Sequence, residues 1–458
     1  MVFSSVTFLF FFLPAFLILY FALPWKNAVL LIGSLLFYAW GEARFLPLLL
    51  ASALLNYSFG MLISRSRGGR TALLWAGVVT NLALLVWFKY SAFFASIVSQ
   101  LSGRDTALPA LVLPLGISFF TFQGLSYLVD VHRGTVNAQK RFVDFAMYKA
   151  MFPQLIAGPI VRYHHIAADI ERRVVDNARI WFGFRLFVTG LAQKVLIANT
   201  VGQAADGLFN AGATQLSMGA AWLAAMSYSI QILFDFSGYS TMAIGIGHML
   251  GFSYPANFDR PYTARTVTEF WRRWHMSLSS WFRDYVYISL GGNRYAPWRT
   301  YLNLSLVFLL CGLWHGAAWT FVLWGAWHGI LLIVERAWLG ARLRVWPARL
   351  GQAYTLLVVV LGWVLFRAHD VPAALDLLRV MFGAGGSAAP GHAWQIDVGP
   401  AQWCALLAGM VIATVRWPAW SWEPGRRIGQ AMAVLAGLLA CSASLAVGTY
   451  NPFIYFHF

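Results

Sequence analysis

The hydrophobic residues of this chain are grouped into long apolar runs, separated by short loops that hold most of the charged residues. A run of about 20 apolar residues is what an α-helix needs to cross the hydrocarbon core of a bilayer. We also include shorter apolar runs where a neighbouring helix could complete the bundle. The runs lie near residues 5–22, 28–40, 45–63, 71–97, 111–130, 180–204, 217–236, 300–314, 318–335, 352–368, 401–416 and 428–447. The pattern predicts an all-α polytopic membrane protein, a single domain over residues 1–458 with about 11–12 transmembrane helices.

Two further apolar stretches, 143–160 and 237–252, are too short and too rich in Gly, Pro and Ser for regular spans. Irregular backbone at membrane depth is tolerated only where it is buried in protein or lines a cavity. We therefore expect re-entrant or broken helices in these two stretches.

Composition supports the membrane assignment. Of the 458 residues, 59% are hydrophobic and 11% are charged, whereas soluble domains carry roughly 25% charged residues. The net charge of +16 does not indicate nucleic-acid binding, because the basic residues lie in short loops and form no basic domain. The three cysteines show no metal-ligand spacing, so we predict no metal site.

The loop charges predict the orientation in the membrane. If the predicted spans alternate, the basic loops, such as the one with Arg65, Arg67 and Arg70, all fall on one side. Cytoplasmic loops are enriched in Lys and Arg. We therefore expect a multi-pass membrane protein with its basic loops in the cytoplasm and its N-terminus facing outward.

His315 is the strongest candidate for chemistry. It lies between two apolar spans in the sequence Leu-Trp-His-Gly, preceded by Trp314 and flanked by Gly312 and Gly316, which allow close backbone approach. Ionisable residues at membrane depth are costly to insert and usually functional. A neutral imidazole can accept a proton, which suits a general base. A histidine that only hydrogen-bonds two helices together is the alternative from the residue alone.

A second candidate lies in the segment 266–290. Thr266 followed by Glu269 is a capping box, which predicts the start of a helix. Tryptophans and other apolar residues share one third of its circumference, and basic residues occupy the rest. This pattern predicts an interfacial helix, with His275 at the border between its two faces. A membrane-surface helix without chemistry is the alternative.

Three further polar features lie in apolar surroundings. Gln154 and Arg162 flank a segment whose two prolines and glycine exclude a regular helix, and they could offer a donor and a charge to a substrate. Asp235 and Tyr239 stand four residues apart, at helical spacing. Asp235 needs a partner at this depth, and a structural salt bridge is as plausible as a substrate contact. No serine-hydrolase elbow, P-loop or dinucleotide-binding motif is present.

The order of motifs along the chain resembles the alginate O-acetyltransferase branch of the MBOAT (membrane-bound O-acyltransferase) family. The resemblance is carried by the segments 1–5, 114–120, 126–134, 152–159, 235–239, 269–279, 283–294 and 313–316. Its most specific parts are Phe-Trp-Arg-Arg-Trp-His, which ends at His275, and Leu-Trp-His-Gly, which contains His315. Thr241 and His132 depart from the pattern of this branch, which puts the acceptor in doubt more than the reaction.

The resemblance implies a wall of helices around a central tunnel, with His315 as the catalytic histidine and His275 as a second functional one. It implies transfer of an acyl group, expected to be acetyl, from a cytoplasmic thioester such as acetyl-CoA to hydroxyls of an extracytoplasmic polysaccharide such as alginate. It also implies a location in the bacterial inner membrane, a periplasmic partner of the SGNH-hydrolase-like type, and no bound cofactor. Trp314, Asp235, Tyr239, Gln154 and Arg162 are the candidate substrate-binding residues.

Two alternatives remain open at this point. The same site could transfer D-alanyl or lipid acyl groups, which dependence on a carrier protein would reveal. A transporter could use Asp235, His315 and Arg162 as a relay, although the inverted internal symmetry typical of transporters is not visible in the sequence.

Overall fold

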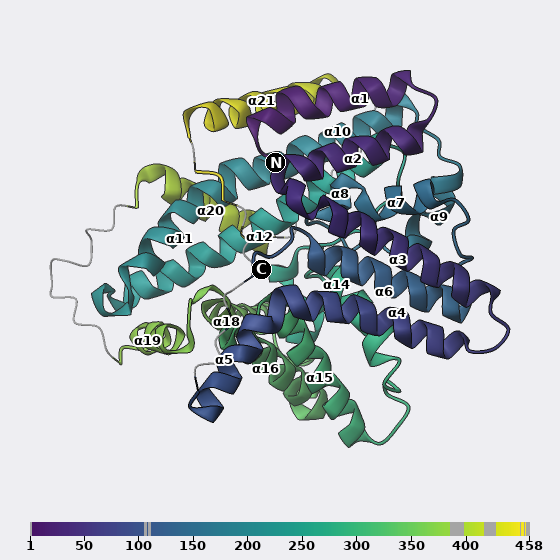
Figure 1. The fold of residues 1–458 in the computed structure, drawn as a ribbon. Helices are drawn as coiled ribbons and strands as arrows, with labels where there is room; N and C mark the ends of the chain where they lie inside the picture. The colour runs from purple at the N-terminus through teal and green to yellow at the C-terminus, as the bar shows by residue number, and fades with distance from the viewer. Residues whose placement is uncertain are drawn as a thin grey trace. The chain divides into compact units, whose positions relative to one another are not determined.

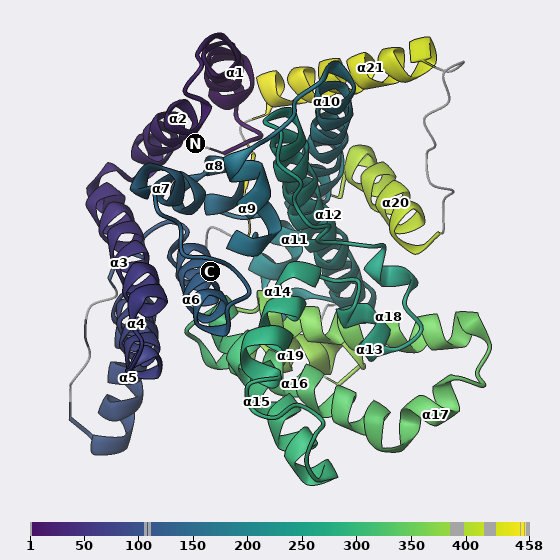
Figure 2. The ribbon, with the colours of Figure 1, turned by 90° about the vertical axis from the view of Figure 1, so that its right-hand side faces the viewer.

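The computed structural model describes residues 2–104, 108, 111–384, 398–415, 427–448, 450–452 and 454. Every regular element in these ranges is a helix, as Figures 1 and 2 show from two directions. The predicted all-α class is confirmed for the part of the chain that the structure describes.

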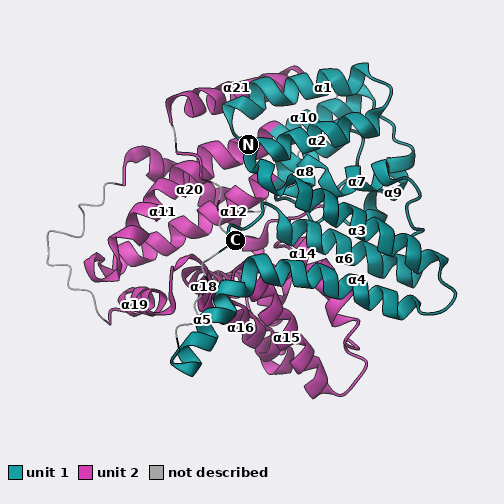
Figure 3. Cartoon of the chain, in the orientation of Figure 1, with its two compact units in different colours: residues 1–187, 240–255 teal, residues 188–239, 256–458 magenta. Residues whose placement is uncertain are grey.

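The chain divides into two compact units, shown in Figure 3. Unit 1 comprises residues 1–187 and 240–255, and unit 2 comprises residues 188–239 and 256–458. The longer helices that begin in unit 1 are α1 (Leu13–Ala22), α2 (Lys26–Glu42), α3 (Leu46–Arg65), α4 (Arg70–Leu85), α5 (Ser91–Ser102), α6 (Ile117–Arg133), α7 (Phe142–Ala150), α9 (Tyr163–Glu171) and α10 (Asn177–Ala192).

Unit 2 starts within α10 and continues through a π-helical stretch. Its elements are η4 (Gln193–Asn199), α11 (Thr200–Ala211), most of α12 (Met218–Met249), α13 (Val267–Trp271), α14 (Met276–Phe282), η7 (Arg283–Tyr287), α15 (Pro297–His315), α16 (Trp319–Val334), η8 (Glu335–Leu339), α17 (Gly340–Leu343), α18 (Ala348–Arg367), α19 (Val371–Met381), α20 (Pro400–Thr414) and α21 (Arg427–Val447).

Several of these helices are long and apolar enough to cross a membrane. The described residues contain five such segments, 26–65, 70–102, 177–211, 348–367 and 428–447, with two shorter apolar helices at 8–22 and 400–414. Many large apolar side chains on them are exposed in the protein, among them Trp40, Trp75 and Leu435. Lipid-facing positions explain that exposure, because hydrocarbon rather than water is their solvent.

The predicted break in the stretch 143–160 is confirmed. Helix α7 ends at Ala150, and a single turn, α8 (Phe152–Leu155), is followed by non-helical backbone up to Arg162. Phe152 is fully buried in unit 1. Its ring contacts the rings of Phe3, Phe8, Phe12, Phe16 and Phe37. Aromatic packing therefore holds the irregular segment in place.

The predicted break in the stretch 237–252 is wrong, because α12 runs without interruption through this stretch to Met249. Its glycines provide close packing instead of a break. Within unit 2 a Cβ on Gly238 would lie 2.7 Å from the carbonyl oxygen of Gly190, and within unit 1 a Cβ on Gly245 would lie 2.5 Å from that of Gly183. Small residues at such positions let membrane helices approach closely.

Candidate active site

Helices α15 and α16 form a tight hairpin in unit 2 that fixes the position of His315. A Cβ on Gly312 would lie 2.2 Å from the carbonyl oxygen of Phe321, and one on Gly325 would lie 2.3 Å from that of Phe308. Neither distance leaves room for a side chain, so the two backbones touch at these glycines. The expected close approach at Gly312 is confirmed.

His315 is the last residue of α15 and is 1% exposed. Its ring is surrounded by aromatic rings, with centroid distances of 4.9 Å to Trp314, 5.1 Å to Trp324 and 5.1 Å to Phe366. The following residue, Gly316, has no room for a Cβ beside the ring of Phe321. The imidazole is therefore enclosed by aromatic side chains at a helix end and is shielded from solvent.

The prediction of one interfacial helix over 266–290 is wrong. Thr266 does cap a helix, accepting a hydrogen bond from the backbone N–H of Glu269, but α13 ends at Trp271. The chain turns, and α14 begins after His275, whose φ of 41° is left-handed. Left-handed backbone is unfavourable for a non-glycine residue and is found mostly where the surrounding structure imposes it.

The turn between α13 and α14 buries His275, which the helical pattern had placed at the border between the apolar and the basic face. His275 is fully buried in unit 2, and Trp274 beside it is almost so. The carboxylate of Glu335 fixes the start of α13, accepting from the backbone N–H groups of Val267 at 2.6 Å and Thr268 at 2.9 Å. Tertiary contacts of this kind override the local periodicity at His275, whereas Arg272 and Arg283 of the predicted basic face are exposed.

Asn257 determines which nitrogen of His275 carries the proton. Its Oδ1 lies 3.0 Å from His275 Nδ1, and it accepts hydrogen bonds from the Ser277 hydroxyl at 2.8 Å and the Ser277 backbone N–H at 3.3 Å. A backbone N–H can only donate, so the Asn257 atom is its oxygen. His275 Nδ1 must then donate as well, which leaves Nε2 with a lone pair.

The chemistry of His275 follows from that assignment. Its Nε2 is buried without a hydrogen-bond partner among the described residues. Burial also lowers the pKa of His275 to about 3, so the ring is neutral at physiological pH. No local sequence signal identifies Asn257 as the partner of His275, because it lies 18 residues away and has the appearance of a turn residue.

Trp314 lies between the two histidines. Its indole centroid is 5.9 Å from the ring of His275 and 4.9 Å from that of His315. All three side chains are buried and belong to unit 2. The indole of Trp314 thus contacts two buried imidazoles, one from the turn before α14 and one from the end of α15.

Asp235 and Tyr239 both lie on α12 and are both buried. Asp235 forms an ion pair with Lys194 of η4, 2.5 Å between Nζ and Oδ1. Of the two possibilities that the sequence left open, the structure contains the salt bridge. Phe236, the next residue along α12, packs edge-on against His275 with a centroid distance of 4.6 Å.

Gln154 and Arg162 belong to unit 1, whereas the two histidines belong to unit 2. Gln154 is fully buried and donates a hydrogen bond to the carbonyl oxygen of Tyr148 at 2.6 Å. Arg162 is the residue that precedes α9 and is also buried. Their assignment to substrate binding stays a prediction.

His328 of α16 lies among aromatic rings, and its Nδ1 accepts a hydrogen bond from the Trp271 indole N–H at 3.4 Å. Among the described residues, no group of three His, Cys, Asp or Glu side chains is placed to hold a metal ion. We therefore interpret His328 as a residue that connects α13 to α16.

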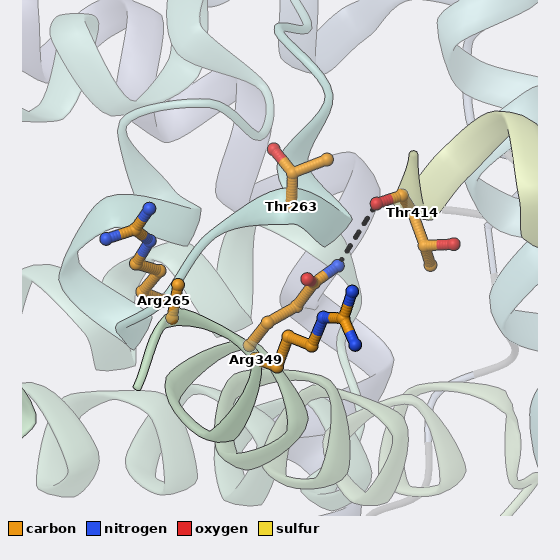
Figure 4. Close-up of a pocket in the computed structure, with 6 residues that line it drawn as sticks. Thr263, Arg265, Arg349 and Thr414 are labelled. Carbon is orange, nitrogen blue, oxygen red and sulfur yellow. Dashed lines mark hydrogen bonds between the residues drawn. The ribbon is translucent and has the colours of Figure 1, made fainter. Parts of the chain in front are cut away.

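A small pocket of about 190 Å³ lies elsewhere in unit 2, beside the first turn of α18. Figure 4 shows Arg349 leaning toward Thr414, while the guanidinium of Arg265 points away from both. Gln352 donates to the carbonyl oxygens of Tyr262 and Thr414 there. None of the candidate residues lines this pocket, so it is separate from the histidine site.

Comparisons with known proteins converge on one family. The model of the membrane-bound O-acyltransferase family matches residues 139–372, which include both histidines. The "Probable alginate O-acetylase AlgI" of Azotobacter vinelandii is 43% identical over 91% of this chain and 84% of its own length. The protein of the same name in Pseudomonas aeruginosa is 42% identical over 90% of this chain and 79% of its own. The "Peptidoglycan O-acetyltransferase" of Helicobacter pylori is 38% identical over 84% of this chain and 80% of its own length.

Proposed function

Because the chain belongs to the membrane-bound O-acyltransferase family and is a multi-pass O-acyltransferase, we propose that it acetylates an extracytoplasmic polysaccharide. The donor is a cytoplasmic thioester, acetyl-CoA or another acyl thioester, and the acceptor is a sugar hydroxyl of a polymer such as alginate. The similarity to alginate O-acetylases and to a peptidoglycan O-acetyltransferase, over most of the chain, supports a polysaccharide acceptor.

In the proposed reaction His315 is the general base. It takes the proton of the acceptor hydroxyl while the oxygen attacks the thioester carbonyl. The tetrahedral intermediate then collapses, the C–S bond breaks, and the proton passes from the imidazolium to the departing thiolate. The dry aromatic surroundings of His315 support this role, because a base shielded from water is not already hydrogen-bonded to solvent.

The single observation that carries the proposal is the fixed tautomer of His275. With Nδ1–H held by Asn257, the unpartnered Nε2 lone pair can accept a hydrogen bond from a neighbouring hydroxyl of the acceptor sugar. That contact orients the sugar, so that its reacting hydroxyl gives its own proton to His315, whose ring also lies beside Trp314. Trp314 and Tyr239 are proposed to line the substrate path.

The proposed sidedness follows from the loop charges. Basic loops in the cytoplasm place the N-terminus outside and the protein in the inner membrane. Transfer then carries the acyl group across the membrane, with help from a periplasmic partner of the SGNH-hydrolase-like type.

The test is transfer by purified protein in sealed proteoliposomes. Radiolabelled acetyl-CoA is supplied on the side exposing the basic loops, and alginate or peptidoglycan fragments on the other, with and without the partner encoded by neighbouring genes. The proposal expects label on the polysaccharide. Two results would contradict the proposal. Transfer of D-alanyl groups that requires a loaded carrier protein would support the D-alanyl alternative. Movement of substrate without covalent transfer would support a transporter.

A further inference from the structure

The segment after α21 is bound along η4, α11 and α12 of unit 2. The Tyr450 hydroxyl donates to Asp206 at 2.6 Å, and Asn199 donates to the Asn451 side chain at 3.1 Å. Lys194 donates to the carbonyl oxygen of Pro452, and the backbone N–H of Ile454 donates to Asp235 at 2.9 Å. Each described residue of this segment thus has a polar partner in the helices.

The order of these partners gives the segment a direction. As the segment advances from Tyr450 to Pro452, its partners move back along the helices from Asp206 to Lys194. The segment therefore runs antiparallel to η4 and α11. Room for it is provided by Gly202, where a Cβ would lie 2.9 Å from the Tyr450 hydroxyl.

Lys194 and Asp235, which hold the last described residues of the segment, form a buried ion pair. Both side chains are 2% exposed. Burying two charges is costly unless their remaining donors and acceptors are also satisfied. Here the backbone of the segment satisfies them, because Pro452 accepts from Lys194 and Ile454 donates to the second oxygen of Asp235. The pair and the segment therefore stabilise each other.

This ion pair is next to the histidine site along α12. Asp235 holds the segment, and the adjacent Phe236 packs edge-on against His275. A shift of α12 at Asp235 would move the ring that contacts His275. Misplacement of about 1 Å by a distant mutation can cost an enzyme about 10²-fold in rate.

We propose that Lys194 and Asp235 are positioning residues for acyl transfer: they dock residues 450–452 and 454 on η4 and α12 and thereby hold Phe236 against His275. Neither residue touches the substrate. The proposal rests on the proposed function for its effect on transfer, but docking of the segment can be measured without any transfer.

The experiment introduces a disulfide cross-link between the segment and η4 in the full-length protein, called the lock below. Cysteines replace Asn199 and Asn451, whose side chains are in contact, in a protein whose native cysteines are changed to alanine. We expect the disulfide to form on mild oxidation and the locked protein to remain active. In Asp235→Asn, which keeps the shape but removes the charge, we expect less disulfide at a given time and about 10²-fold slower transfer.

The decisive step is rescue. Oxidation should restore most of the transfer rate of Asp235→Asn by tethering the segment, and a reductant should abolish the gain. The matched control is Tyr450→Phe, which removes only the hydroxyl that donates to Asp206 and should have a smaller effect on both readouts.

The outcomes separate the possibilities. If the locked Asp235→Asn protein stays inactive although the disulfide has formed, Asp235 acts directly and the proposal is wrong. It is also wrong if Asp235→Asn forms the disulfide as readily as the parent protein, or if the lock itself stops transfer. Absence of transfer by the unmutated protein would instead contradict the proposed function, and the disulfide yields would still decide whether the pair docks the segment.

Discussion

Replacing Asn257 with alanine tests the tautomer assignment of His275. The substitution removes the oxygen that accepts from His275 Nδ1 at 3.0 Å and leaves His275 itself in place. The proton is then free to move to Nε2, and in that tautomer Nε2 no longer offers a lone pair to the acceptor sugar. The expected result is a lower kcat with little change in KM for the donor.

The expected loss of rate in Asn257→Ala follows from the energy of one buried hydrogen bond, between Asn257 and His275. Its net contribution is about 1 kcal/mol, up to about 1.5 kcal/mol, which corresponds to a five- to tenfold change in the population of the correct tautomer. Asn257→Ala should therefore slow transfer roughly five- to tenfold. This loss is much smaller than that expected for removing a general base, about 10²- to 10⁴-fold.

The assay compares initial rates of acetyl transfer in proteoliposomes, with the melting temperature of each variant as the measure of folding. Asn257 also accepts from the Ser277 hydroxyl, which lies 3.4 Å from His275 Nδ1, so Ser277→Ala is the control that removes this hydroxyl but keeps the contact between Asn257 and His275. Asn257→Asp keeps an acceptor oxygen and should be more active than Asn257→Ala. A folded Asn257→Ala protein with the parental rate would refute the tautomer argument.

Further predictions concern packing, anchoring and orientation. Gly312→Ala should destabilise the protein by about 1–3 kcal/mol, because its Cβ has no space beside Phe321, whereas Gly219→Ala, with nothing within 4 Å, should leave the melting temperature unchanged. Glu335→Gln should lower the melting temperature, since a neutral amide loses the charge-assisted bonds to the start of α13, worth about 1.5–3 kcal/mol each. A single cysteine at Arg67 should react with a membrane-impermeant maleimide only from the cytoplasmic side, and labelling from outside would contradict the predicted orientation.

The sequence predicted the elements that local pattern controls. The all-α class, the break near Phe152 and the start of a helix after Thr266 depend on hydrophobic runs, prolines and a capping residue, which act within a few positions. The position of His315 at a helix end between glycines depends on the same local signals.

The features that the sequence did not predict depend on contacts between distant residues. The left-handed turn at His275 goes against the helical periodicity of its own segment and is imposed by Asn257 and by the packing around it. The partner of Asp235 lies 41 positions earlier, at Lys194, inside a predicted apolar span. The glycines of α12 have the composition of a break, but the structure uses them for helix contact.

The central claim is that His315 takes the proton of the acceptor hydroxyl, and His315→Gln tests it most directly. Glutamine preserves hydrogen bonding and similar bulk but cannot accept a proton at neutral pH. We expect a protein with the parental melting temperature whose acetyl transfer, measured with its partners present, is slower by about 10²- to 10⁴-fold. A folded His315→Gln protein that acetylates polysaccharide at near the parental rate would show that His315 is not the base.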